Sequence, residues 1–173
     1  MQLIKCTAKL RKEMGLKDSA LFAGEAPSSG LGSWHANLLT IQRHKFVLFA
    51  NDKTLFNFIT PDVRRSEIRE LHKLFLTYLH PVLAQEDFTR QQRDSIASEY
   101  DKIAYARSNN RSVLGSMNDL AFNYEYRIMM LGSLHSPEMP KIISELNRMP
   151  MGALQYAYPI EILKQHVQAT YNT

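Results

Sequence analysis

One segment limits the possible folds most, because it alternates extended apolar runs with very short polar turns. Trp34–Gln42, Lys45–Ala50 and Thr54–Ile59 are rich in β-branched, aromatic and other apolar side chains, which is typical of strands. Arg43-His44 and Asn51-Asp52-Lys53 separate these runs as turns. Strands joined by two or three residues pair in the antiparallel direction. The segment therefore predicts a three-stranded antiparallel meander, and apolar residues on both of its faces indicate cover by helices.

Further short strands and several helices are predicted on either side of the meander. Residues 2–6 and 103–107 have the pattern of strands, and helices are predicted where apolar residues recur every three or four positions. The predicted helices run up to Gly15, from Ser66 to Val82, from Thr89 to Tyr100, from Ser112 to Gly132, from Lys141 to Asn147, and onward from Pro159. Pro81 is expected to kink or end the second helix, since proline removes a backbone donor. This order predicts an α+β fold with a small, mainly antiparallel sheet (the meander plus one or two further strands) packed with several α-helices.

Size and composition indicate one globular domain over residues 1–173. Hydrophobic residues make up 45% of the chain and charged residues 22%, and a chain of this length buries enough surface to fold without a disulfide or a structural metal. The single cysteine, Cys6, excludes an internal disulfide and any zinc site that needs two thiolates from one chain. We expect this thiol to be buried and inert.

The sequence predicts neither a membrane span nor a secretion signal. The longest apolar run, Phe46–Ala50, covers five residues, whereas a helix needs about 20 to cross a bilayer. Met1–Lys5 lacks the apolar core of a signal peptide. We therefore expect a cytoplasmic protein without membrane contact.

Positive charge is concentrated in the first half of the chain. Residues 1–86 hold 12 Lys and Arg against 8 Asp and Glu, and residues 87–173 hold 9 of each. Basic side chains gather at the start of the second predicted helix, namely Arg64, Arg65, Arg69 and Lys73. Such a group suits contacts with phosphates, whereas the interleaved Glu67 and Glu70 are typical of an ordinary solvated helix face.

The most polar segment, Asn109–Asp119, lies at the start of the longest predicted helix. Two neighbouring rows of candidate ligand-binding residues lie on this helix, Ser112, Ser116 and Asp119 in one row and Arg111, Gly115 and Asn118 in the other. Gly115 would let a ligand approach closely, and Arg111 with the free amides of a helix start suits a phosphate or carboxylate. Alternatively, Asn109 or Asn110 caps the helix while the serines and Asp119 bond to the adjoining strand.

Trp34 and His35 form the second candidate site. In a strand, Trp34 and Ala36 point to one face of the sheet, and His35 and Asn37 to the other. His35 beside Asn37 is a candidate for orienting a substrate or for acid–base chemistry. The alternative is that Trp34 anchors the core and the His-Asn pair satisfies the preceding loop. No third catalytic member is identifiable from the sequence.

Neither a metal nor a cofactor is expected. The six histidines show no His-x-x-x-His spacing and have no accompanying carboxylate cluster. The glycine-rich stretch 24–33 lacks the Gly-Lys-Ser/Thr ending of a phosphate-binding loop.

Several of these segments together resemble a bacterial family known only as a domain of unknown function. They are Ile4–Leu10, Trp34–Leu38, Asn51–Phe56, Asn109–Asp119, and Leu146–Met151 with Tyr158–Ile160. The resemblance covers nearly the whole chain and implies a single domain of the bacterial cytosol. It implies no activity and no catalytic residues.

Three hypotheses for the function remain, in decreasing order of preference. The first is a non-enzymatic binding or regulatory module that holds a ligand or a protein partner at the polar helix start and the meander. The second is a nucleic-acid-associated protein, plasmid- or phage-related, that uses the basic half of the chain. The third is an enzyme acting on a phosphorylated or acyl substrate, which requires convergence in one pocket of Arg111, Ser116, Asn118, Asp119 and His35.

Overall fold

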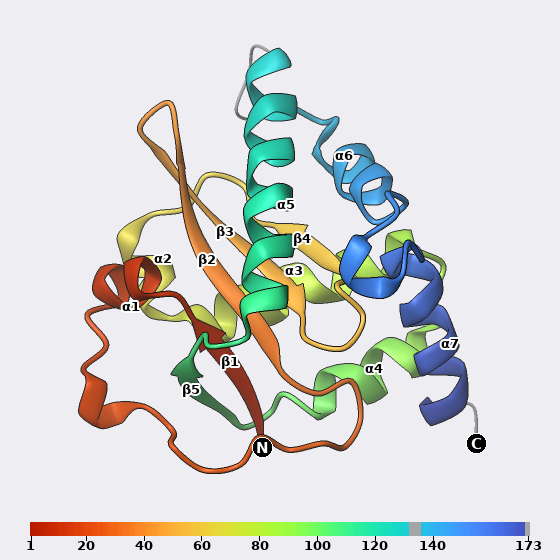
Figure 1. Ribbon diagram of the computed structural model, residues 1–173, viewed down its shortest axis with the longest axis horizontal. Helices are drawn as coiled ribbons and strands as arrows, with labels where there is room; N and C mark the ends of the chain where they lie inside the picture. Colours follow the sequence, from red (N-terminus) through yellow and green to blue (C-terminus); the bar gives the residue numbers. More distant parts are fainter. Residues whose placement is uncertain (132–135, 172–173) are drawn as a thin grey trace.

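The fold is built on a five-stranded sheet with the strand order β4-β3-β2-β1-β5. The computed structural model describes residues 1–131 and 136–171, and it places helices on both faces of this sheet (Figure 1). The strands are β1 (Gln2–Cys6), β2 (Trp34–Ile41), β3 (His44–Asn51), β4 (Asn57–Ile59) and β5 (Ile103–Arg107). The α+β class predicted from the sequence is confirmed.

The helices of the described residues follow the predicted order. They are α1 (Ala8–Met14), α2 (Arg65–Arg69), α3 (Leu71–Gln85), α4 (Arg90–Ser98), α5 (Arg111–Met130), α6 (Met139–Leu146) and α7 (Pro159–Tyr171). Gly15 ends α1 with a φ of 71°, a left-handed conformation that glycine adopts without steric cost. The predicted end of the long helix at Gly132 lies outside the described residues. Among the helices described here, none is both long and apolar enough to span a bilayer.

The predicted meander is confirmed as β2, β3 and β4, which pair antiparallel in sequence order. The β2–β3 turn lies one residue earlier than predicted, at Gln42 and Arg43, with φ values of 49° and 70°. Positive φ at both central residues gives the backbone twist that a two-residue hairpin needs. The hairpin therefore extends as a regular ladder from Trp34 opposite Asn51 to Ile41 opposite His44.

The prediction of a mainly antiparallel sheet was wrong, because the sheet is mixed. β1 pairs in parallel with β2 on one side and with β5 on the other. Parallel neighbours need a long connection. α1 and a loop join β1 to β2, and the chain between β1 and β5 contains the meander and α2 to α4. Local turn chemistry fixes only the antiparallel half of the sheet.

The second predicted helix differs from the structure in two ways. It is split at Glu70 into α2 and α3, and it does not end at Pro81 but continues to Gln85. Leu79, Val82 and Leu83 flank the proline and are buried in the core. Their packing outweighs the backbone hydrogen bond that Pro81 cannot donate.

The two faces of the sheet carry different side chains. Trp34 lies on the face covered by α3, where its ring packs edge-on against Phe75 at 5.2 Å and its Nε1 donates to the Tyr100 hydroxyl at 2.8 Å. The predicted role of Trp34 as a core anchor is therefore confirmed. The opposite face carries His35 and, over β2 and β3, the long helix α5 (Figure 1).

Cys6 is fully buried in β1, as predicted. Burial raises the pKa of its thiol to about 12, and only the nearby Arg11 works in the opposite direction. At neutral pH the thiol is therefore protonated, which makes it a poor nucleophile.

Candidate functional site

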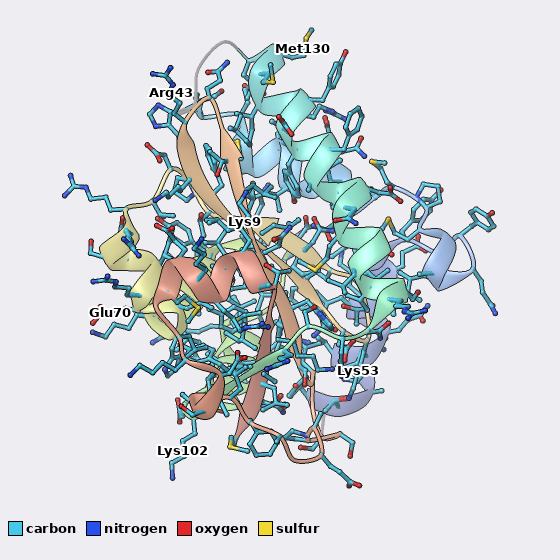
Figure 2. All side chains as sticks on the ribbon, turned by 60° about the vertical axis from the view of Figure 1, so that its left-hand side comes forward. Lys9, Arg43, Lys53, Glu70, Lys102 and Met130 are labelled. Atoms are coloured by element: carbon cyan, nitrogen blue, oxygen red, sulfur yellow. The ribbon has the colours of Figure 1, made fainter. Side chains whose placement is uncertain are left out.

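A cluster of polar side chains lies beneath the N-terminal end of α5, where the parallel strands β1 and β5 end. The polar cluster comprises Lys5, His35, Asp52, Ser108 and Asn110. Figure 2 labels Lys53, the neighbour of Asp52, near this end of α5. Ligands of open sheets commonly bind outside the carboxyl ends of parallel strands, so the cluster lies where a site is expected.

Strand register brings these residues together from distant parts of the sequence. Lys5 pairs with His35 in the parallel β1–β2 ladder, so their side chains lie on the same face. Asp52 directly follows β3, and Ser108 directly follows β5, where its backbone N–H donates to the Cys6 carbonyl at 3.2 Å. Asn110 precedes α5 as its N-cap.

Asp52 is the acidic centre of the polar cluster. Its Oδ2 accepts from Lys5 Nζ at 2.7 Å, and its Oδ1 accepts from His35 Nε2 at 3.1 Å and from Asn110 Nδ2 at 3.4 Å. Burial alone would raise the pKa of this carboxyl, but the hydrogen bonds and charges of His35 and Lys5 outweigh burial and hold the pKa well below its usual value. Asp52 is therefore a carboxylate at neutral pH.

The charge of Asp52 fixes which way the hydrogen bonds of His35 run. A carboxylate only accepts, so His35 Nε2 carries the proton that it shares with Asp52. In a neutral imidazole the other nitrogen is then an acceptor. His35 Nδ1 lies 2.6 Å from Ser108 Oγ, so the serine hydroxyl donates to it whenever the imidazole is neutral. The result is a relay in which Ser108 donates to His35 and His35 donates to Asp52.

The two ends of this relay differ in their access to solvent. The His35 side chain is completely buried, the Asp52 side chain is 22% exposed, and Ser108 is half-buried. A pocket of about 470 Å³ is lined by both sequence neighbours of Ser108, Arg107 and Asn109, but not by Ser108 itself. Further lining comes from β1, from β5 and from the loop after α1, notably Leu3, Lys5, Leu21, Phe22 and Ala106.

Backbone amides next to Ser108 are free to bind an oxygen. Within the described chain, neither Asn109 nor Asn110 has a hydrogen-bond acceptor opposite its backbone N–H. Both amides belong to the turn that enters α5, whose macrodipole adds positive potential there. In many hydrolases the backbone N–H of the residue after the nucleophilic serine is one of the donors that stabilise the oxyanion, and a second donor comes from another loop.

The polar start of α5 is in part a capping structure, as one of the two interpretations predicted. Asn110 Oδ1 accepts from the backbone N–H groups of Ser112 and Val113 at 3.1 and 3.3 Å. The expected bond from the serines to the adjoining strand is not formed by Ser116, whose hydroxyl donates to the Ser112 carbonyl one turn earlier at 3.1 Å. Helical geometry places that carbonyl within easier reach than a strand.

The predicted ligand residues on α5 separate into two groups. Ser116 and Asp119, together with Asn123, line a second pocket of about 410 Å³ against residues 149–153. Arg111, Ser112, Gly115 and Asn118 are exposed and do not line it. Open space lies beside Gly115. A ligand role for this part of α5 stays a prediction.

The candidates from the two segments do not converge. His35 belongs to the polar cluster, whereas Trp34 faces the opposite side of the sheet and lies in the core. Asn37 does not satisfy the loop before β2, because its Oδ1 accepts from the Thr7 hydroxyl at 2.9 Å. The pocket required by the enzyme hypothesis in its predicted form, with His35 beside Ser116 and Asp119, is not formed.

Sequence reasoning missed Lys5, Asp52 and Ser108. Each has a positional signal, since Asp52 and Ser108 directly follow strands and Ser108 also precedes a helix. Their convergence depends on the parallel pairing of β1, which no local pattern reveals. In the ranges 1–131 and 136–171, no group of three His, Cys, Asp or Glu side chains comes close enough to hold a metal ion.

Comparison with protein families agrees with the resemblance noted from the sequence motifs. The family described as "Domain of unknown function (DUF6933)" matches residues 3–162. The chain belongs to this family. The match includes every member of the polar cluster of the DUF6933 domain. No curated protein and no solved structure matches the chain.

Proposed function

We propose that this DUF6933 protein is a serine hydrolase that cleaves small acyl esters, with Ser108 as nucleophile, His35 as general base and Asp52 as the group that orients His35. The observation that carries the proposal is the continuous relay from Ser108 Oγ through both nitrogens of His35 to Asp52. The sequence patterns favoured a binding module over an enzyme, because no sequence pattern indicates that Asp52 and Ser108 lie next to His35.

The first half of the reaction uses the relay as a base. Ser108 Oγ attacks the carbonyl carbon of the ester while His35 Nδ1 takes the hydroxyl proton. Asp52 stabilises the imidazolium that forms, and Lys5 and Asn110 hold the carboxylate in place. The carbonyl oxygen becomes an oxyanion, for which the free amides of Asn109 and Asn110 are the donors.

The second half of the reaction returns the proton. The imidazolium of His35 protonates the departing alcohol as the carbon–oxygen bond to it breaks, leaving an acyl group on Ser108. Water then attacks this acyl group, with His35 again taking a proton and passing it back to Ser108 Oγ. The products are a carboxylic acid and an alcohol, and no other reactant is consumed.

The pocket beside Ser108 favours a short acyl chain. Leu3, Leu21 and Phe22 give it an apolar part, and its volume of about 470 Å³ falls in the range of small-molecule sites. Arg107 adds a guanidinium that is 61% exposed and pairs with Asp18 at 2.7 Å. A substrate with a small apolar acyl group and a polar leaving alcohol fits this lining.

Hydrolysis of p-nitrophenyl acetate and butyrate by the purified full chain tests the proposal. We expect Ser108→Ala to lower kcat/KM by about 10³-fold or more, because the nucleophile is lost. Ser112→Ala is the matched control: this serine is exposed on the first turn of α5 and makes no contact with His35.

Two results would contradict the proposal. One is a wild-type rate equal to that of buffer with both esters. The other is a Ser108→Ala protein as active as the Ser112→Ala protein, since activity would then come from another site.

A further inference from the structure

A second surface, distinct from the polar cluster, carries most of the excess positive charge. It is formed by α1, by α2 and by the tip of the β2–β3 hairpin. Figure 2 views this side, with Lys9 on α1, Arg43 at the hairpin tip and Glu70 where α2 ends. We call it the basic face, and its cations are Lys9, Lys12, Arg43, Lys45, Arg64, Arg65 and Arg69.

One carboxylate holds the three parts of the basic face together. Glu13, on α1, accepts from Lys45 Nζ at 2.5 Å and lies 3.6 Å from Arg65 Nε on the first turn of α2. The hydrogen bond from Lys45 lowers the pKa of Glu13, so this link persists at neutral pH. The backbone adds a further tie, since Val63 N–H donates to the Lys45 carbonyl at 2.9 Å. The three elements that carry the cations therefore have fixed relative positions.

Most cations of the basic face lack a carboxylate partner. Only Lys45 and Arg65 form ion pairs there, and within the described residues the other five reach no acidic group at ion-pair distance. The acidic side chains among them are Glu13, Asp62, Glu67 and Glu70, so three positive charges remain. The net charge of the whole chain is +4. Most of the excess charge predicted for the first half of the chain therefore lies on one surface.

The absence of apolar side chains on the basic face indicates the kind of partner. The large hydrophobic residues that the described structure exposes lie at Met1, on α5 and near residues 156–158, and none lies on α1, α2 or the hairpin tip. Amphipathic helices that bind membranes insert apolar residues into the lipid, and proteins that bind single-stranded nucleic acid commonly stack its bases on aromatic side chains. Regularly spaced phosphates need only fixed cations.

We infer that the basic face binds the phosphate backbone of a nucleic-acid duplex without reading its sequence. Lys9, Lys12, Arg43, Arg64 and Arg69 are the phosphate contacts, and Glu13 holds the three elements in register for them. This inference does not depend on the proposed hydrolase activity, because Ser108 and its partners are not part of the basic face.

Fluorescence anisotropy with a 20-base-pair duplex, prepared once as DNA and once as RNA, tests the inference with the full chain. Five phosphate contacts release about five counterions, so we expect the affinity to fall about 500-fold between 50 and 200 mM salt. The DNA and RNA arms show which backbone is preferred. Vesicles containing phosphatidylserine form a third arm.

Charge reversal on the basic face tests the assignment of residues. The double variant Arg64→Glu and Arg69→Glu removes two exposed contacts and should lower the slope of log affinity against log salt by about two. The double variant Lys9→Glu and Lys12→Glu repeats the test on α1. Lys141→Glu with Lys164→Glu is the matched control, with the same change in net charge on the exposed surfaces of α6 and α7.

Each outcome decides the question. Salt-dependent duplex binding that is weakened by both basic-face variants and kept by the control and by Ser108→Ala supports the inference. No duplex binding at 50 mM salt overturns it, as does an equal loss in the control variant. Binding to vesicles but not to either duplex also overturns it and identifies a membrane surface instead.

Discussion

Two polar networks lie beside α5, one at its N-terminal end and one near its middle, and they differ in whether they reach a pocket. The second network joins Asn57 on β4, Tyr124 on α5 and Asn147 after α6, and all three are completely buried. Tyr124 donates to Asn57 Oδ1 at 2.7 Å, and Asn147 Oδ1 accepts from the Asn57 backbone N–H at 2.9 Å. Every polar side-chain atom of this network has a partner.

The two networks differ in charge and in access to solvent. The buried network contains no charged group, and it fixes β4, α5 and α6 relative to one another. The polar cluster has an ionised centre at Asp52 and ends in a half-buried hydroxyl at Ser108 beside a pocket. We therefore expect changes in the buried network to lower stability, and changes in the polar cluster to lower activity.

The largest expected effect is on hydrolysis in Asp52→Asn. An amide in place of the carboxylate no longer fixes the proton on His35 Nε2, so Nδ1 stops acting as a base, and we expect kcat/KM to fall by about 10³- to 10⁴-fold. Ester hydrolysis at pH 7 measures this. Asp62→Asn is the control. Asp62 also pairs with a histidine on the surface, His44 at 2.7 Å, but in the described structure no serine is bonded to that histidine. Equal activity in the two variants would show that the relay has no catalytic role.

Asn147→Ala should give the largest loss of stability. It leaves the buried backbone N–H of Asn57 without an acceptor and removes one of the two acceptors of the Asn57 side-chain amide, which costs about 3 kcal/mol of unfolding free energy. Urea unfolding followed by circular dichroism measures the change, with the exposed Asn118→Ala as control. The activity of the folded fraction should stay the same. A loss below about 1 kcal/mol would remove the structural role assigned to this network.

The unfolding free energy at acid pH should depend on the polar cluster, which contains the ionised Asp52, and not on the uncharged buried network. Because the folded pKa of Asp52 lies below its unfolded value of about 3.9, its contribution is present above that pH and is lost as the pH falls below it. We expect unfolding free energy measured from pH 6 to pH 3 to fall less steeply in Asp52→Asn than in wild type. Asp119→Asn, which alters an exposed carboxylate without an ion pair in the described structure, should follow the wild-type curve. Superimposable curves for Asp52→Asn and wild type would contradict the ion pairing of Asp52.

The smallest effect is expected from Tyr124→Phe. It removes one hydrogen bond to Asn57 Oδ1 without changing the shape of the buried side chain, so we expect a loss of about 1 kcal/mol. Burial raises the pKa of this tyrosine far above its usual value, so the loss should not change between pH 6 and pH 9. A loss that varies with pH in this range would show that Tyr124 is not protonated as assigned.

Local patterns predicted the elements of this fold better than their pairing. The meander, β1, β5, the Gly15 stop and the Asn110 cap follow from neighbouring residues, and all are confirmed. The parallel pairing of β1 depends on crossovers of many residues, so no short window contains it. Of the two effects expected at Pro81, a kink or an end of the helix, the end is excluded, because packing of the neighbouring residues carries the helix on to Gln85.

The candidate site was only partly predictable for the same reason. His35 was identified, with the correct face of β2, because alternation along a strand is a local property. Its partners come from positions 52 and 108, and they reach His35 only through the register of three strands. The density of polar residues predicted ligand contacts at residues 111–119 of α5, whereas the relay ends at Ser108, three residues before Arg111.

Covalent labelling tests the central claim most directly. The intact protein is incubated with a fluorophosphonate, which reacts with activated serine hydroxyls, and is then examined by mass spectrometry before and after proteolysis. We predict one adduct per chain, located on Ser108, with labelling abolished in Ser108→Ala and strongly slowed in Asp52→Asn. Absence of an adduct under conditions that label a known serine hydrolase, or an adduct on another residue, would contradict the assignment of Ser108 as a nucleophile.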